Sequence, residues 1–140
     1  MKPSHPFTEA DASALLVGRG IQPTSQRVTI TRVLFQRCEH MSAEDVYREV
    51  NACDQLVSKA TVYNTLGLLA EKGVVREVIA NPSKVFYDPN TAPHHHFYNE
   101  ETGALTDIDA KDVHVVGLPP LPPGADLQGV DVIVRLRHTK

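Results

Sequence analysis

Cysteine is scarce in this 140-residue sequence, and tryptophan is absent. The two cysteines, Cys38 and Cys53, do not form a CxxC pair, and we expect both thiols to be reduced and buried as small apolar groups at helix ends. The sequence also lacks a long apolar run and the basic-then-apolar N-terminal pattern of a signal peptide. These absences predict a cytoplasmic protein without a membrane span.

The sequence has little excess charge of either sign, with a formal net charge of −3. Residues 1–80 carry nine Lys/Arg and nine Asp/Glu, and residues 81–140 carry five and eight, so the difference is zero in the first segment and −3 in the second. Bulk positive charge therefore does not indicate binding to nucleic acid. If the first half binds DNA, it does so through a local patch and a dimer.

Sequence motifs of catalysis are missing as well. The chain has no HExxH, GxSxG, P-loop or GxGxxG pattern. We therefore predict that the protein is not an enzyme. A metal-dependent hydrolase, which needs an open coordination position and a base, stays open as an alternative.

Short helices are predicted throughout the first half. Thr8–Asp11 starts one helix, and an apolar stripe from Val28 to about Cys38 indicates a second. Ser42–Asp45 resembles a capping box at the start of a third helix. Ser58 caps a fourth, which Gly73 ends.

The fourth predicted helix has two different faces. Its apolar face, which should be buried, consists of Val62, Leu66 and Leu69. Small and hydrogen-bonding residues form the opposite face and its flanks: Ala60, Thr61, Tyr63, Asn64 and Gly67. Such a face allows a helix to approach a DNA groove closely. An ordinary solvated face accounts for it equally well on this helix alone.

Strands are predicted after the fourth helix. Val74–Ala80 and Lys84–Tyr87 flank a turn at Asn81–Ser83. Helices followed by such a hairpin predict a winged helix-turn-helix. Further strands are expected at His94–Asn99, Ala104–Ile108 and Val130–Leu136, with one or two helical turns at Asp109–Val116 and a proline-rich loop over 118–124.

The predicted fold class is α+β. Residues 1–88 should form the winged-helix DNA-binding domain, 89–93 a hinge, and 94–140 a small α/β domain for dimerisation and metal sensing. Two domains of this size have thin cores, so we expect a homodimer to supply further burial.

A run of three histidines is the strongest sign of function. Alternate residues of a strand share a face, so His94 and His96 should converge. Asp88 at the hinge, Asp107 on the paired strand and His40, which opens the third helix, should reach the same point. Imidazole nitrogens and carboxylate oxygens suit Zn²⁺, Fe²⁺ or Mn²⁺. The sequence therefore predicts one divalent ion per subunit, bound by five ligands.

Other histidines carry weaker indications. His95, His114 and Asp131 are candidates for a lesser second metal site. The run His94, His95 and His96 is also a candidate for binding haem. His5 and His138 are expected to be ordinary surface histidines.

Four segments together resemble the ferric uptake regulator family. They are Gln22–Arg27 (QPTSQR), His40–Tyr47 (HMSAEDVY), Ala60–Leu66 (ATVYNTL) and the histidine run. The resemblance covers nearly the whole chain. It implies a homodimer with an N-terminal winged helix, a C-terminal α/β dimerisation domain and a regulatory metal site. That site falls on the same five residues: His40, Asp88, His94, His96 and Asp107.

The sequence departs from the family in three places. Asn99 and Thr102 stand where most members have a CxxC pair, and a second CxxC is absent, so no structural Cys₄ zinc is expected. Gln22 stands where a Lys or Arg often enters the minor groove, and Arg19 is the candidate substitute. The helix of the dimerisation domain is shortened to the proline-rich loop.

These departures resemble the iron response regulator branch, in which haem is the signal. The HHHFY run and the ending 130–137 (VDVIVRLR) are similar to that branch. The Cys-Pro haem motif of some members is missing, since Cys38 precedes Glu39 and Cys53 precedes Asp54. Haem-triggered degradation is therefore not expected.

The predicted function is a metal- or haem-responsive transcriptional regulator of iron homeostasis genes that binds an A/T-rich palindromic operator. Tyr63 would contact thymine methyls beside Thr61 and Asn64, and Lys59 and Arg27 would contact phosphates. One alternative is a peroxide sensor that uses iron or manganese at the same site. The other is a metal-storage or hydrolytic protein that does not bind DNA.

Overall fold

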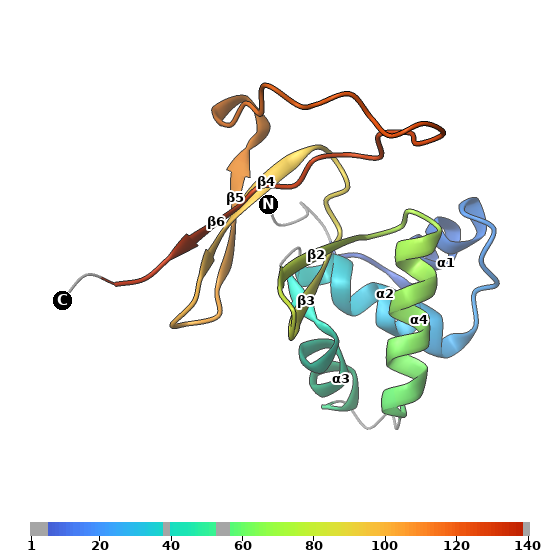
Figure 1. Cartoon of the computed structure of the whole chain (residues 1–140). Helices are drawn as coiled ribbons and strands as arrows, with labels where there is room; N and C mark the ends of the chain where they lie inside the picture. Colours follow the sequence, from blue (N-terminus) through green and yellow to red (C-terminus); the bar gives the residue numbers. More distant parts are fainter. Residues whose placement is uncertain (1–5, 38–39, 53–56, 139–140) are drawn as a thin grey trace. The chain divides into compact units, whose positions relative to one another are not determined.

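The computed structural model of the protein describes residues 6–37, 40–52 and 57–138 (Figure 1). The chain divides into two compact units, Met1–Thr91 and Ala92–Lys140. Cys38, Cys53 and His5 lie outside the described residues, so the roles expected for them stay predictions. Among the described residues, no helix combines the length and the apolar character needed to cross a membrane.

Within its described residues, the first unit contains four helices and a small sheet (Figure 1). The helices are α1 (Glu9–Gly18), α2 (Ser25–Arg37), α3 (Ala43–Asn51) and α4 (Lys59–Glu71). The strands are β1 (Met41–Ser42), β2 (Arg76–Asn81) and β3 (Lys84–Asp88), which pair antiparallel in the order β1-β3-β2. The helices followed by the β2–β3 hairpin form a winged helix-turn-helix, as predicted.

Hydrogen bonds at the caps explain where three of the helices begin. The Thr8 hydroxyl accepts the Asp11 N–H, and the Asp11 carboxylate accepts the Thr8 N–H. Ser42 and Asp45 make the same reciprocal pair at α3, so both helices have complete capping boxes with aspartate at the third position. At α4 the Ser58 hydroxyl accepts the Thr61 N–H.

The apolar sides of the helices share one core. Its fully buried members include Leu16 of α1, Ile30 and Leu34 of α2, Val46 of α3, and Val62, Leu66 and Leu69 of α4, each 0% exposed. The apolar face predicted for α4 is therefore confirmed. This core fixes α4 by one side and leaves its opposite side exposed.

The second unit is a three-stranded sheet. Its strands are β4 (His94–Asn99), β5 (Leu105–Asp109) and β6 (Ile133–Leu136), in the order β5-β4-β6. β5 runs antiparallel to β4, and β6 runs parallel to it. Between β5 and β6 the only helical segment is the 3₁₀ turn Ala110–Asp112, and residues 113–132 have neither helix nor strand.

Several boundaries differ from those predicted. α3 begins at Ala43, as the capping box at Ser42 predicts, and not at His40, because Met41–Ser42 forms β1, a strand too short to show a periodic pattern. β6 begins at Ile133 rather than at residue 130, and the predicted helical turns at 109–116 are reduced to three residues. The α+β class itself is confirmed.

Candidate metal ligands and DNA-facing helix

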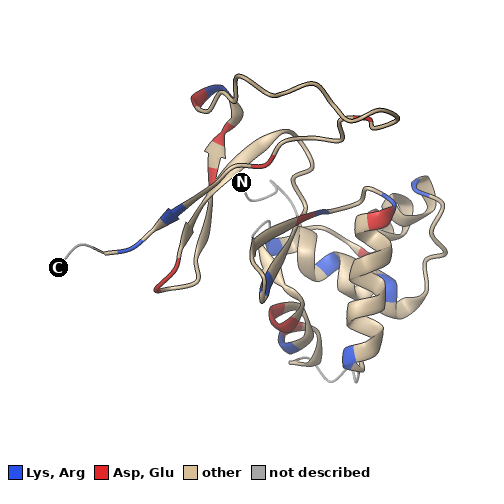
Figure 2. Cartoon of the chain, viewed as in Figure 1, with Lys and Arg blue, Asp and Glu red and all other residues tan. Residues whose placement is uncertain are grey.

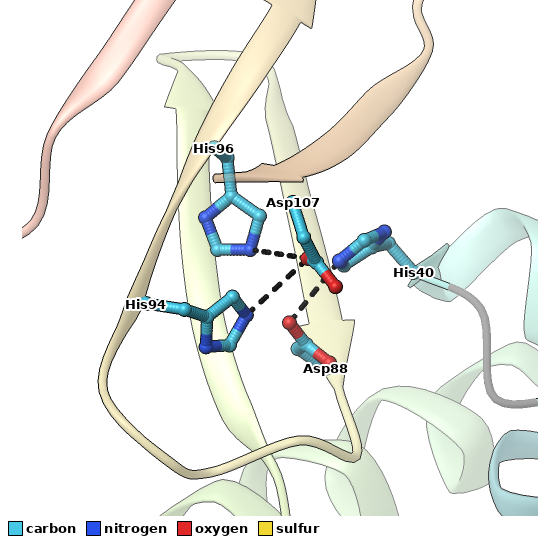
Figure 3. A group of neighbouring side chains, drawn as sticks. All are labelled: His40, Asp88, His94, His96 and Asp107. Carbon is cyan, nitrogen blue, oxygen red and sulfur yellow. Dashed lines mark ion pairs between the residues drawn. The ribbon is translucent and has the colours of Figure 1, made fainter. Parts of the chain in front are cut away.

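His94 and His96 converge on Asp107 within the second unit (Figure 3). Strand alternation puts both histidines on one face of β4, and the register of β4 with β5 places Asp107 opposite His96. Asp107 Oδ1 lies 3.4 Å from Nε2 of His94 and 3.5 Å from Nε2 of His96. The two rings meet edge to face with their centroids 4.5 Å apart. Both histidines are buried, whereas about half of the Asp107 side chain is exposed.

The tautomer of His94 suits a metal ligand. Its Nδ1 lies 2.6 Å from the carbonyl oxygen of Ala92. Because a carbonyl only accepts hydrogen bonds, Nδ1 carries the proton and donates it. The neutral ring then presents a lone pair at Nε2, on the side of Asp107. A backbone carbonyl that fixes a ligand histidine in this way is a common support of metal sites.

His40 and Asp88 form a second pair of candidate ligands, within the first unit (Figure 3). His40 precedes β1, and Asp88 ends β3, the strand paired with β1. The His40 Nε2 atom lies 3.2 Å from Asp88 Oδ2, and both side chains are largely buried. The two units therefore each contain histidine and carboxylate groups of the types that hold a divalent cation.

The residues of the predicted second site are not gathered into a ligand group in the part of the chain that the structure describes. His95 lies on the other face of β4, and its Nδ1 accepts the N–H of Val132 at 3.0 Å. The neutral His95 ring therefore carries its proton at Nε2. His114 and Asp131 are both exposed.

The face of α4 that the sequence predicts to lie opposite the buried face is exposed. Ala60, Asn64 and Gly67 are exposed, and Tyr63 is 49% exposed. Thr61 is half-buried, and its hydroxyl lies 3.0 Å from that of Ser58. The helix thus presents an aromatic ring, an amide and small residues on a stable support.

The two arginines that are predicted to contact DNA each donate hydrogen bonds to backbone carbonyls of the protein itself. Arg19 Nη1 donates to the carbonyls of Lys72 and Gly73, at 3.3 and 3.2 Å, and so ties the end of α1 to the end of α4. Arg27 Nη1 donates to the carbonyl of Gln22 at 3.0 Å, and the Gln22 residue is exposed.

Lys59 has a partner on α3. Its ammonium lies 3.5 Å from Glu44 Oε2 and 5.6 Å from the centroid of the Tyr47 ring. The sequence does not predict this contact, because it depends on how α3 and α4 pack against each other in the tertiary structure.

Tyr87 is a buried phenol on the wing. Burial raises the pKa of Tyr87 above its ordinary value, and Glu77, opposite it on β2, and Tyr63 raise it further. The side chain stays neutral near pH 7 and joins the apolar core.

The fold and the ligand groups define a winged-helix protein with candidate metal ligands. The α/β arrangement predicted for its small C-terminal unit is reduced to a three-stranded sheet and one 3₁₀ turn. The chain belongs to the Ferric uptake regulator family, which matches residues 18–117. The members of this family are dimeric, metal-responsive, DNA-binding transcription regulators rather than enzymes.

One relative is similar to this chain in sequence, and two solved structures are similar to it in fold. The peroxide-responsive repressor PerR of Staphylococcus aureus strain Mu50 is 33% identical over 104 residues, which are 74% of this chain and 69% of that protein. The ferric uptake regulator from Pseudomonas aeruginosa with manganese superposes with a TM-score of 0.69 at 23% identity, over 92% of this chain and 98% of that one. The ferric uptake regulator of Vibrio cholerae gives 0.72 at 20% identity, over 91% and 100%. These two structures share the fold.

Proposed function

We propose that the protein is a homodimeric, metal-responsive repressor or activator of iron homeostasis genes, acting on DNA in the cytoplasm. The observation that carries this proposal is the convergence of His94, His96 and Asp107 in a chain whose α4 exposes a nearly uncharged face. Family membership supports DNA binding and metal response in general.

One divalent ion per subunit, Fe²⁺, Mn²⁺ or Zn²⁺, would be held by His40, Asp88, His94, His96 and Asp107. The donors are imidazole nitrogens and carboxylate oxygens, which suit all three ions. Only five residues separate Asp88 from His94 in the chain, a span of at most about 20 Å even when fully extended. When bound, the ion supplies positive charge shared by ligands of both units. Metal binding would in this way restrict how the DNA-binding unit is oriented.

The DNA contact would be made by the exposed side of α4 in the major groove of an A/T-rich palindrome. Tyr63 would meet thymine methyls, with Thr61 and Asn64 beside it. Phosphate contacts would come from Lys59 and Arg27. Gln22 and Arg19 are weaker candidates, since the Arg19 guanidinium already binds two carbonyls.

The sensory signal has two candidates. Similarity to the iron response regulators favours haem bound at His94, His95 and His96. Similarity to two strains' PerR repressors, at 33% and 32% identity, favours a peroxide sensor in which iron at the five-ligand site directs oxidation of a ligand histidine.

Removing two ligands tests the metal proposal. The His94→Ala/His96→Ala variant should lose stoichiometric Mn²⁺ in equilibrium dialysis and keep its helical circular dichroism. His138→Ala, an exposed histidine of the same unit, is the matched control and should bind Mn²⁺ normally. Full occupancy in the double variant would place the ion elsewhere. Loss of metal without any change in DNA affinity would make the site structural.

Three further measurements separate the alternatives. Binding of a synthetic A/T-rich palindromic duplex, but not of a scrambled one, excludes a storage or hydrolytic protein that ignores DNA. Mass spectrometry of the Fe²⁺-loaded protein after peroxide treatment should find an added oxygen on His94 or His96 only if the peroxide alternative holds. Haem titration of the wild type and of a variant lacking all three consecutive histidines tests the haem alternative.

A further inference from the structure

Lys59 is the only basic residue of α4, and it stands at the first position of the helix. The charges of this helix lie at its two ends, with Lys59 at the start and Glu71 at the finish (Figure 2). The first turn of α4 contains no acidic residue. The Lys59 ammonium therefore adds to the positive end of the helix dipole, which is equivalent to roughly half a charge. No acidic side chain in the same turn compensates it.

The compensating anion comes from α3. Glu44 Oε2 lies 3.5 Å from the Lys59 ammonium, and the two side chains are 46% and 59% exposed. Tyr47, one turn further along α3, places its ring under the same ammonium at 5.6 Å. A helix N-terminus with a lysine attracts anions such as phosphate. In this molecule the anion beside the Lys59 ammonium is the carboxylate of Glu44.

We infer that Glu44 is an intramolecular competitor of the DNA backbone, and that its carboxylate must give up Lys59 before a phosphate can take it. This inference rests on the proposed DNA contact of α4. It assigns Glu44 an affinity-setting role rather than a contact with DNA. The Tyr47 ring keeps the Lys59 ammonium nearby during the exchange, because it attracts the cation without neutralising it.

This exchange of one anion for another at Lys59 explains how the first unit, which has no excess positive charge, sets its affinity for DNA. The free protein presents Lys59 as a neutralised pair, so contact with arbitrary DNA gains little from it. A correctly docked α4 brings a phosphate to the helix N-terminus and replaces the carboxylate. Exposed ion pairs are weak, so removing the competitor should tighten DNA binding by about two- to fivefold at low salt.

The test measures the affinity for a synthetic A/T-rich palindromic duplex by fluorescence anisotropy, with the full chain saturated with Mn²⁺. Glu44→Gln should bind more tightly than the wild type, and the gain should shrink as salt rises, because screening weakens the Glu44–Lys59 pair anyway. Glu49→Gln is the matched control. It removes the same charge from the same helix, and Glu49 is similarly exposed but pairs with Arg37 at 3.3 Å.

A double-mutant cycle decides whether Glu44 acts through Lys59. In a Lys59→Gln background, Glu44→Gln should no longer change the affinity. Glu44→Asp, which keeps the charge on a shorter side chain, should lie between the wild type and Glu44→Gln. Circular dichroism and Mn²⁺ stoichiometry confirm that each variant is folded and loaded.

Three outcomes would overturn the inference. They are an unchanged affinity in Glu44→Gln, an equal gain in Glu49→Gln, and a gain that persists in the Lys59→Gln background. The second and third would show a general effect of negative charge instead of exchange at Lys59. If the wild type itself does not distinguish the palindrome from a scrambled duplex, the proposed DNA contact fails, and the role of Glu44 fails with it.

Discussion

Replacing Tyr63 by alanine should weaken DNA binding while leaving the fold intact. Tyr63 is 49% exposed, whereas its neighbour Val62 is fully buried. Burying a large apolar side chain completely contributes about 1.5–3 kcal/mol, so truncating a half-exposed ring should lower the free energy of unfolding by about 1 kcal/mol or less. Leu66→Ala provides the contrast, because Leu66 is 0% exposed and its truncation should cost about 2–5 kcal/mol of stability.

The expected loss of DNA affinity is larger. A single mismatched base pair in a specific site typically costs about 1–3 kcal/mol, and losing the Tyr63 contact with thymine should have a similar effect, roughly 5- to 150-fold in the dissociation constant. Tyr63→Phe keeps the ring and should retain most of the affinity. The loss in Tyr63→Ala should be greatest on duplexes that keep the A/T-rich half-sites.

Fluorescence anisotropy at one fixed salt concentration is the suitable assay, since the affinity of such complexes depends strongly on salt. Urea unfolding of the same samples gives their stability. A folded Tyr63→Ala protein that binds the palindrome like the wild type would refute the assignment of this helix face to DNA. A loss of affinity that is no larger than the loss of folded protein would refute this assignment as well.

Three further results are expected. Gly73→Ala should lower the free energy of unfolding by about 1–2 kcal/mol, measured by urea unfolding. Gly73 has a φ of +75°, and an added Cβ would lie 2.9 Å from Arg19 Nη1. An unchanged unfolding midpoint would show that the backbone relaxes there. The raised pKa of Tyr87 contributes stability that is present below about pH 10 and is lost as the pH rises further. The stability of the wild type should therefore fall above about pH 10, and Tyr87→Phe should flatten this fall. Stability curves that fall in parallel for the two proteins would contradict this. Light scattering at micromolar concentration should give about twice the protomer mass of 15.4 kDa through pairing of residues 94–140, and a monomer under all metal conditions would exclude the homodimer.

Features that depend on neighbouring residues followed directly from the sequence. The capping boxes at Thr8 and Ser42 and the buried face of α4 are local consequences of side-chain chemistry and of the helical period. Strand alternation likewise placed His94 and His96 on one face and His95 on the other. The short strand β1 escaped prediction because two residues carry no periodic signal.

Tertiary structure decided which distant groups meet. The register of β4 with β5 brings Asp107, rather than Asp109, opposite His96, and a shift by one residue would have turned the carboxylate to the other face. The crossing of α3 and α4 joins Glu44 to Lys59, and the packing of α1 leads the Arg19 guanidinium to the end of α4. Spacing along the chain identifies residues able to bind a metal or a phosphate, but pairing and packing between distant segments determine which partners their charged atoms have.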